Sequence, residues 1–388
     1  MVITVIIIII LATATINMTF GDNGLITQAR KAKDMTANSI VAEQEEMNSL
    51  MDEYANVMKE DSEIMPPTPE KSEVADAIEN NTQFTETTTI TDDLDNPVTI
   101  PGGFHLAEDS GTKVEEGIVI EDNTENHNQF VWIPVGEYNV TQTIEAITEP
   151  DSQDGKLINK LTRRQWGTEE DVEQIPTPIT DDEVADGYRG EVYYGEGATQ
   201  DKDGSPISPV ETNIEAFKTS ATTNGGFYIG RYEQGAGNVC KAGVDAYTNV
   251  TRDQAKTQAE AMYMEKAEIK ATTQLISSYA WDTALNFICQ TNADGYELAT
   301  TTDETKANIG TSNKTQTGEY TADNYSKIHD FLGNCYEWTT EYSVGSVGRC
   351  VRRGGNFDGF SDNYAANRDN CSTSLYNSYI SFRSQLYV

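Results

Sequence analysis

The sequence predicts an irregular α+β domain preceded by a long N-terminal helix. Three observations support this: short apolar runs of strand length, two segments with helical periodicity, and long polar loops between them. The chain has 388 residues, enough for one large domain with attachments. Its contents of 37% hydrophobic and 23% charged residues are typical of a globular body.

The chain is strongly acidic, with a formal net charge of −36. Such a surface repels phosphate backbones, so we expect no nucleic-acid partner. A surface rich in carboxylates is also suited to binding divalent cations.

The chain begins with a hydrophobic segment, residues 1–19, that contains five successive isoleucines. We expect it to form a helix close to the length of a membrane span, followed by an amphipathic helix at 20–62. This arrangement resembles the N-terminus of type IV pilin-like proteins, although the basic leader and processing site of that family are missing. The resemblance implies insertion into a membrane or a pilus; a buried core helix is the alternative.

The orientation of such an anchor follows from two opposing features. Arg30, Lys31 and Lys33 follow the apolar segment and would keep that flank cytoplasmic. The acidic, asparagine-rich body favours the other side. We expect the body outside the cell, displayed on its surface.

An acidic Thr/Pro linker is predicted at 63–97, since Pro66, Pro67 and Pro69 end the preceding helix. The globular domain then covers 98–388. Short strands are expected at 117–120, 130–135 and 227–232, and residues 148–213 are predicted to be a long loop insertion, because they are polar and rich in Gly, Pro and Asp.

Two helices are predicted more firmly. Thr251 and Gln254 match a capping box, and good helix formers follow at 255–265. The second helix is predicted at 277–290, where four residues share one face at helical spacing. These are Trp281, Ala284, Leu285 and Ile288.

Several short motifs follow one another along the chain. They are Gly-Phe-Tyr-Ile-Gly-Arg-Tyr-Glu at 226–233, Ala-Trp-Asp-Thr-Ala at 280–284, Gly-Asn-x-x-Glu-Trp at 333–338, Arg-Gly-Gly-Asn-Phe at 353–357 and Phe-Arg at 382–383. In this order they resemble the formylglycine-generating-enzyme family, over most of the chain after the linker. The resemblance implies a C-type-lectin-like fold.

The resemblance also implies structural roles for five residues. Trp338 is expected in the core, Gly354 and Gly355 in a tight turn, and Arg353 and Arg383 as buried polar anchors. Relatives hold a calcium ion at the position of Asn334, which implies a structural calcium here; we expect no other cofactor.

Enzymes of that family bind copper through two cysteines, four and nine residues after the second glycine of the Gly-Gly pair. Here these positions are Gly359 and Tyr364. Neither can supply the thiolate that soft copper needs. We therefore expect no catalysis, and an oxidoreductase of the formylglycine-generating type remains the alternative.

Other possible reactive groups lack a supporting pattern. His105, His127 and His329 have no metal-ligand spacing, and no matching nucleophile follows His329-Asp330. The five cysteines show no C-x-x-C spacing. They are expected to be buried small side chains, or to include one disulfide, for which Cys335 and Cys371 are our choice.

The C-terminal segment has a restricted composition. Lys, Glu, Gln, Met and Trp do not occur between Asn356 and Ser384, whereas Asn, Tyr, Asp and Ser are frequent. Every residue there can be encoded by a codon ending in C or T, as mutation of asparagine codons at their adenines would produce. This segment resembles the variable region of the target proteins of diversity-generating retroelements, which commonly have a C-type-lectin-like fold.

Tyr, Ser, Asn and Gly are typical of adaptable binding loops, although the same residues also simply fill loops. We therefore expect a surface-displayed, non-catalytic protein that binds an unknown protein or cell-surface ligand; a structural pilin-like subunit is a further alternative. The expected ligand contacts are Asn356, Phe357, Asp358, Phe360, Asp362, Asn363, Tyr364, Asn367, Asp369, Asn370, Tyr376, Asn377 and Tyr379.

Overall fold

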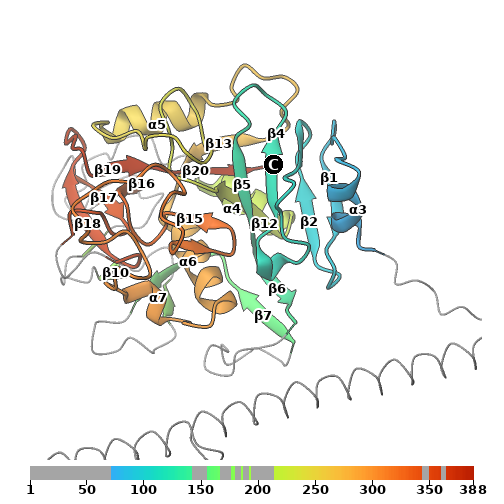
Figure 1. Cartoon of the computed structure of the whole chain (residues 1–388), viewed down its shortest axis with the longest axis horizontal. Helices are drawn as coiled ribbons and strands as arrows, with labels where there is room; N and C mark the ends of the chain where they lie inside the picture. The colour runs from blue at the N-terminus through green and yellow to red at the C-terminus, as the bar shows by residue number, and fades with distance from the viewer. Residues whose placement is uncertain are drawn as a thin grey trace, which may run out of the picture. The chain divides into compact units, whose positions relative to one another are not determined.

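The computed structural model describes most of the chain after Glu70, and there the chain is α+β, with many short strands and few helices (Figure 1). None of the described helices is long and apolar enough to span a membrane. The predicted helices at 1–19 and 20–62 lie outside the described residues. The described residues are 71–141, 155–166, 176–179, 185–186, 192–193, 214–342, 349–359 and 364–388.

The predicted linker is folded from Lys71 onward. Helix α3 (Glu73–Glu79) is capped by the Ser72 hydroxyl, which accepts a hydrogen bond from the Ala75 amide at 3.1 Å. Strands β1 (Thr88–Thr91) and β2 (Pro97–Ile100) pair antiparallel. The threonine run that indicated a loose linker is β-branched, and β-branched residues favour strands once one face is covered.

A six-stranded antiparallel sheet forms the centre of the domain, in the order β13-β20-β12-β5-β4-β3. Strand β12 is buried along its whole length, which explains its continuous apolar sequence. The late strand β20 lies inside the sheet, between β12 and β13 (Figure 1). The bounds are β3 Phe104–Leu106, β4 Val119–Asp122, β5 Gln129–Pro134, β12 Gly226–Gly230, β13 Thr272–Leu275 and β20 Ser384–Tyr387.

Both firmly predicted helices are present. The capping box of Thr251 and Gln254 begins α5 (Arg252–Ala261), which ends four residues before the predicted end. Helix α6 (Ser278–Thr291) is buried on all sides up to its last residue, so it is a core helix rather than a surface one. Two further helices are α4 (Ile214–Thr223) and α7 (Glu297–Thr300).

A second sheet has four strands in the order β18-β17-β16-β19. Strand β19 runs parallel to β16, and the other pairs are antiparallel. Strand β18 is the edge of this sheet and carries part of the segment with restricted composition. The bounds are β16 Tyr336–Tyr342, β17 Arg349–Arg353, β18 Arg368–Ser372 and β19 Ile380–Phe382.

Short two-stranded pairs and one 3₁₀ turn complete the described chain. Several of these strands fall within 148–213, so this insertion is not loop alone. The bounds of the 3₁₀ turn and of all these short strands are η1 Val114–Glu116, β6 Gly136–Asn139, β7 Lys156–Asn159, β8 Arg163–Gln165, β9 Thr177–Ile179, β10 Ala185–Asp186, β11 Val192–Tyr193, β14 Asn324–Tyr325 and β15 Ile328–His329.

Buried residues join the smaller sheet to α6 and to the loops around it. The indole of Trp338 is fully buried and donates to the Val250 carbonyl at 2.9 Å. Gly354 adopts a φ of +85°, a conformation that favours glycine, and packs against the Trp281 ring. Next to it, Gly355 donates its amide to the Leu332 carbonyl at 3.1 Å.

Arg383 lies between β19 and β20, where the chain passes from one sheet to the other. Its guanidinium bonds the Glu337 carboxylate at 2.9 Å and the carbonyls of Gly230 and His329 at 2.7 and 2.9 Å. Both side chains of the ion pair are fully buried. A buried charge is tolerated only when it is paired and hydrogen-bonded, and this guanidinium meets both conditions.

We predict that Arg383→Met destabilises the domain by about 3–5 kcal/mol, because Glu337 is left as a buried, unpaired charge. Urea unfolding measures this loss. The control is Lys306→Met, which removes a partly exposed pair with Asp294 and should cost less than about 1 kcal/mol. Equal losses in the two variants would contradict the role of Arg383.

Candidate functional site

Apart from Phe357 and Asp358, the predicted contacts that are at least partly exposed in the described residues lie on β18 and on the turn at 373–379 that follows it. Tyr376 is 65% exposed, and together with Met264 it is one of the two exposed large apolar side chains in the described part of the chain. From Cys371 to Tyr379 the side chains alternate between exposed and half-buried. We call β18 and this turn the edge surface.

Arg352 of β17 holds two residues of the edge surface. Its guanidinium carbon lies 4.0 Å from the ring centroid of Tyr336 and 5.6 Å from that of Tyr379. Its Nε donates to Asp369 Oδ2 at 3.0 Å. Although burial disfavours the charge, the Asp369 carboxylate raises the pKa of Arg352. A stacked and paired guanidinium fixes Asp369 and Tyr379 in place.

Sequence reasoning missed Arg352. It lies directly opposite Asp369 across the β17–β18 pair, seventeen residues away along the chain. Only the register of these strands brings the two charges together, and register was not predicted. The opposite charges on the two strands are the signal that a hairpin prediction could have used.

Asn377 is a backbone anchor of the turn. Its carbonyl accepts the Asn249 amide at 2.9 Å and its side-chain oxygen accepts the Ser378 amide at 2.6 Å. The first bond connects the edge surface to the loop that leads into α5, and the second lies within the turn. The main chain at Asn377 is therefore fixed while the neighbouring side chains at Tyr376 and Ser378 face solvent.

Residues 356–358 belong to another part of the fold. Asn356 is only 4% exposed and accepts the Asp358 amide at 2.7 Å. Phe357 is half-buried and exchanges backbone hydrogen bonds with Asn334 and Ser312, and Asp358 is exposed. Among these three residues, only Asp358 is freely accessible.

Two further expected contacts are buried. Tyr364 and Asn367 are each 1% exposed, so the structure does not place them on a surface. Residues 364–367 are held by α6 and β17: Trp281 of α6 donates to the Ala365 carbonyl at 3.0 Å, and Arg353 of β17 donates to that of Asn367 at 2.9 Å. The segment therefore serves the core. Phe360, Asp362, Asn363 and the side chain of Asn370 lie outside the described part of the chain.

We predict that two tyrosine substitutions differ strongly in their effect on the stability of the domain. Tyr364→Ala should destabilise the domain by about 3–5 kcal/mol, since it empties a buried aromatic site. Tyr376→Ala should change stability by less than about 0.5 kcal/mol, because its ring is exposed. Thermal or urea unfolding measures both, and a large loss for Tyr376→Ala would place that ring in the core.

A group of buried carboxyls surrounds Arg383 and is a second candidate for chemistry. Burial, then the neighbouring Asp330, raises the pKa of Asp323 to about 8. Burial raises that of Asp330 to about 7 and also raises the pKa of Glu233. Asp323 accepts the Gly333 amide at 2.9 Å, so this carboxyl holds a turn. These groups sit within the core, where they organise backbone.

His329 lies beside this group. Its ring is 8% exposed, stacks on Tyr232 at 4.8 Å between centroids, and has no hydrogen-bond partner at either nitrogen within the described part of the chain. Burial lowers its pKa to about 4. The nearby thiols of Cys240 and Cys335 have raised pKa values, also through burial. A neutral imidazole among protonated thiols does not form an activated nucleophile.

The buried carboxyls predict a pH dependence. Because the folded-state pKa of Asp323 lies above its ordinary value of 3.8, the folded state binds the extra proton and stability falls as pH rises from about 4 to 8. The Asp323→Asn variant keeps an oxygen acceptor for the Gly333 amide but has no group to titrate at this position. As pH rises over that range, the unfolding free energy of the wild type should therefore fall relative to that of the variant.

Urea unfolding at several pH values measures this difference. The control is Asp303→Asn, because Asp303 is exposed and its pKa is lowered by hydrogen bonds from Thr305. The unfolding free energy of the wild type should not fall relative to that of this control as pH rises. A pH-independent difference for Asp323→Asn would contradict the prediction.

The surroundings of Asn334 do not fit the calcium site that the resemblance implies. Its side-chain oxygen accepts Asn308 Nδ2 and the Thr315 amide, each at 3.0 Å, and its Nδ2 donates to Glu233. Calcium requires six to eight oxygen ligands, and N–H donors occupy the positions around this oxygen. The described residues contain no group of three or more His, Cys, Asp or Glu side chains placed to hold a metal.

The expected disulfide between Cys335 and Cys371 is not formed, since all five cysteines are free thiols. Cys335 is buried beside Glu233, just before β16. Cys371 lies on β18, where its strand partner is Cys350. The spacing of the cysteines along the chain could not reveal that Cys350 and Cys371 lie opposite each other on neighbouring strands.

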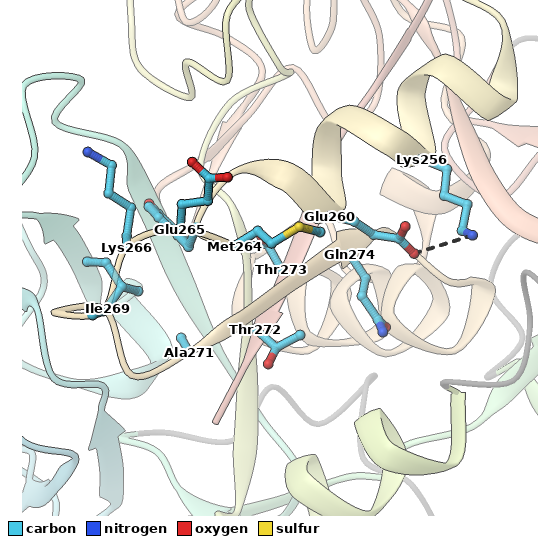
Figure 2. Close-up of a pocket in the computed structure, with 12 residues that line it drawn as sticks. Lys256, Glu260, Met264, Glu265, Lys266, Ile269, Ala271, Thr272, Thr273 and Gln274 are labelled. Carbon is cyan, nitrogen blue, oxygen red and sulfur yellow. Dashed lines mark ion pairs between the residues drawn. The ribbon is translucent and has the colours of Figure 1, made fainter.

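An open groove of about 810 Å³ lies between α5 and the edge strand β13. Figure 2 shows the exposed Met264 among charged neighbours, with Lys256 and Glu260 joined by an ion pair of 3.5 Å. Lysines and glutamates both line it, so its charge favours no ligand class. None of the predicted contact residues lines this groove.

No family model matches the chain, and no curated protein matches it. Among solved structures it is similar to PvdO from Pseudomonas aeruginosa, with 13% identity, a TM-score of 0.37 and coverage of 75% of this chain and 100% of PvdO. It is also similar to Treponema denticola variable protein 1, with 15% identity, a TM-score of 0.32 and coverage of 68% of this chain and 98% of that protein. The similarity to CarF has 16% identity, a TM-score of 0.29 and coverage of 53% of this chain and 96% of CarF. Similarities at this level of identity and TM-score carry no argument about function.

Proposed function

We propose that this chain is a non-catalytic binding protein that contacts its ligand through the edge surface of a C-type-lectin-like domain. One observation carries the proposal: the turn that presents the exposed Tyr376 also contains Tyr379, and Arg352 contacts both Tyr379 and Asp369 of the edge surface. Tyrosine supplies a large contact area with little loss of conformational entropy, and a rigid support reduces the cost of binding further.

The division between support and surface favours this role. The anchors Trp338, Arg353 and Arg383 are fully buried, whereas Ser372, Ser374, Tyr376 and Ser378 are exposed. Substitution of exposed side chains away from such anchors usually changes stability little. The exposed positions of the edge surface can therefore vary in chemistry while the domain stays folded.

We further propose that a retroelement diversifies this surface. The support is the restricted composition between Asn356 and Ser384 and the exposure of several residues within it. Buried residues such as Tyr364 and Asn367 limit how much of the segment can change. Diversification should therefore concentrate on the exposed positions.

The remaining features of the proposal follow from the sequence. Gly359 and Tyr364 stand where copper-binding cysteines would be needed, which supports a role without catalysis. The hydrophobic segment 1–19 would anchor the protein in a membrane or pilus with the domain outside the cell. The net charge of −36 supports a partner other than nucleic acid.

The first test is deep sequencing of the 3′ end of the gene in a growing population that carries an active retroelement. Substitutions should occur at adenine-derived positions in the codons for exposed residues, such as Asp358, Ser372 and Tyr376. Codons for the anchors Gly354 and Arg383 should stay fixed. An invariant 3′ end would remove the diversification proposal.

The second test compares capture of surface proteins by the wild type and by a Tyr376→Ala, Tyr379→Ala variant. Loss of two aromatic contacts should weaken capture by about tenfold or more. Met264→Ala is the matched control, because Met264 is 74% exposed and lines the groove beside α5. Equal capture by the wild type, the double variant and the control would contradict the assignment of the binding site to the edge surface.

A further inference from the structure

Two cysteines face each other across the strands that support the edge surface. Cys350 of β17 is the direct register partner of Cys371 of β18, and the Cys350 sulfur lies 3.7 Å from the Cys371 carbonyl oxygen. Opposite residues of antiparallel strands have Cα atoms about 4.5 or 5.5 Å apart. Both spacings fall within the range of about 4.4–6.8 Å that disulfides span.

The surroundings of the two thiols are unequal. Cys350 is fully buried, and burial together with the neighbouring Cys371 thiol raises its pKa. Cys371 is half-buried on the edge strand, so a solute can reach it. Arg252 and Asp253 of α5 are the charged groups that act on Cys350. One thiol is therefore accessible, and the other is shielded behind it.

We propose that Cys350 and Cys371 form a cross-strand disulfide that locks the edge strand β18. The bond would be a modification site set by the redox state of the surroundings. Its formation follows from the strand register alone. Its effect on ligand binding rests on the proposed function.

The chemistry requires an oxidant, and a low-molecular-weight disulfide such as glutathione disulfide suffices. The Cys371 thiolate attacks one sulfur of the oxidant, which breaks its S–S bond and releases one glutathione thiolate. The Cys350 thiolate then attacks the Cys371 sulfur and displaces the second glutathione. Two protein thiols lose two electrons and two protons, and one glutathione disulfide becomes two glutathione molecules.

The position of β18 explains what the bond would change. Within the described residues, this strand is hydrogen-bonded to β17 on one side and has no strand on the other, since it ends the four-stranded sheet. An edge strand opens more easily than a central one. A covalent bond to β17 would restrict that opening and would hold Asp369 and the turn with Tyr376 in one arrangement.

The test treats the purified full chain with glutathione disulfide and then alkylates it in denaturant. Two of the five thiols should resist alkylation, the intact mass should fall by about 2 Da, and a non-reducing digest should link Cys350 to Cys371. Cys371→Ala should abolish all three signals. The control Cys289→Ala removes a buried thiol of α6 and should keep the link.

Hydrogen exchange of the same samples tests the locking. Amides of 368–379 should exchange more slowly in oxidised than in reduced wild type, and the Cys371→Ala variant should show no difference. Alkylation of all five thiols after oxidation, or a link to another cysteine, would overturn the proposed disulfide. Neither result depends on a ligand, so this test is separate from the capture experiment.

Discussion

The buried contact between Arg383 and Glu337 is the constraint on which the two sheets depend. Arg383 stands where β19 of the smaller sheet leads into β20 of the larger one, and Glu337 lies on β16. The same guanidinium bonds a carbonyl of β12. One side chain therefore connects both sheets, and its charge is tolerated because its N–H groups bond the Glu337 carboxylate and backbone carbonyls. The edge surface is supported by the strands that this contact holds.

The parts of the fold with strong local signals could be predicted from the sequence. The capping box at Thr251 and the helical spacing around Trp281 predicted α5 and α6, since caps and periodicity act over a few residues. Composition was a poorer guide. The threonines near Thr88 indicated a linker, yet they form a strand because Ile90 is buried against the domain.

The candidate site was predicted in part, and the misses have one physical cause. Tyr364 and Asn367 have the residue types of a binding loop, but both are buried in a segment that bonds to α6 and β17. Arg352 and Cys350 belong to the site through their partners across β17 and β18. Burial and strand register are set by residues far away in the chain, and residue type alone does not encode them.

The position of β20 has a consequence for how a cell makes this protein. The larger sheet needs β20 between β12 and β13, but β20 is translated after all the other strands of the described residues. The sheet can therefore close only after β20 itself has left the ribosome. A frameshift or premature stop between β13 and β20 would leave β12 and β13 without their shared neighbour. Proteolysis of such unfinished chains would act as a reading-frame check on every copy of the gene.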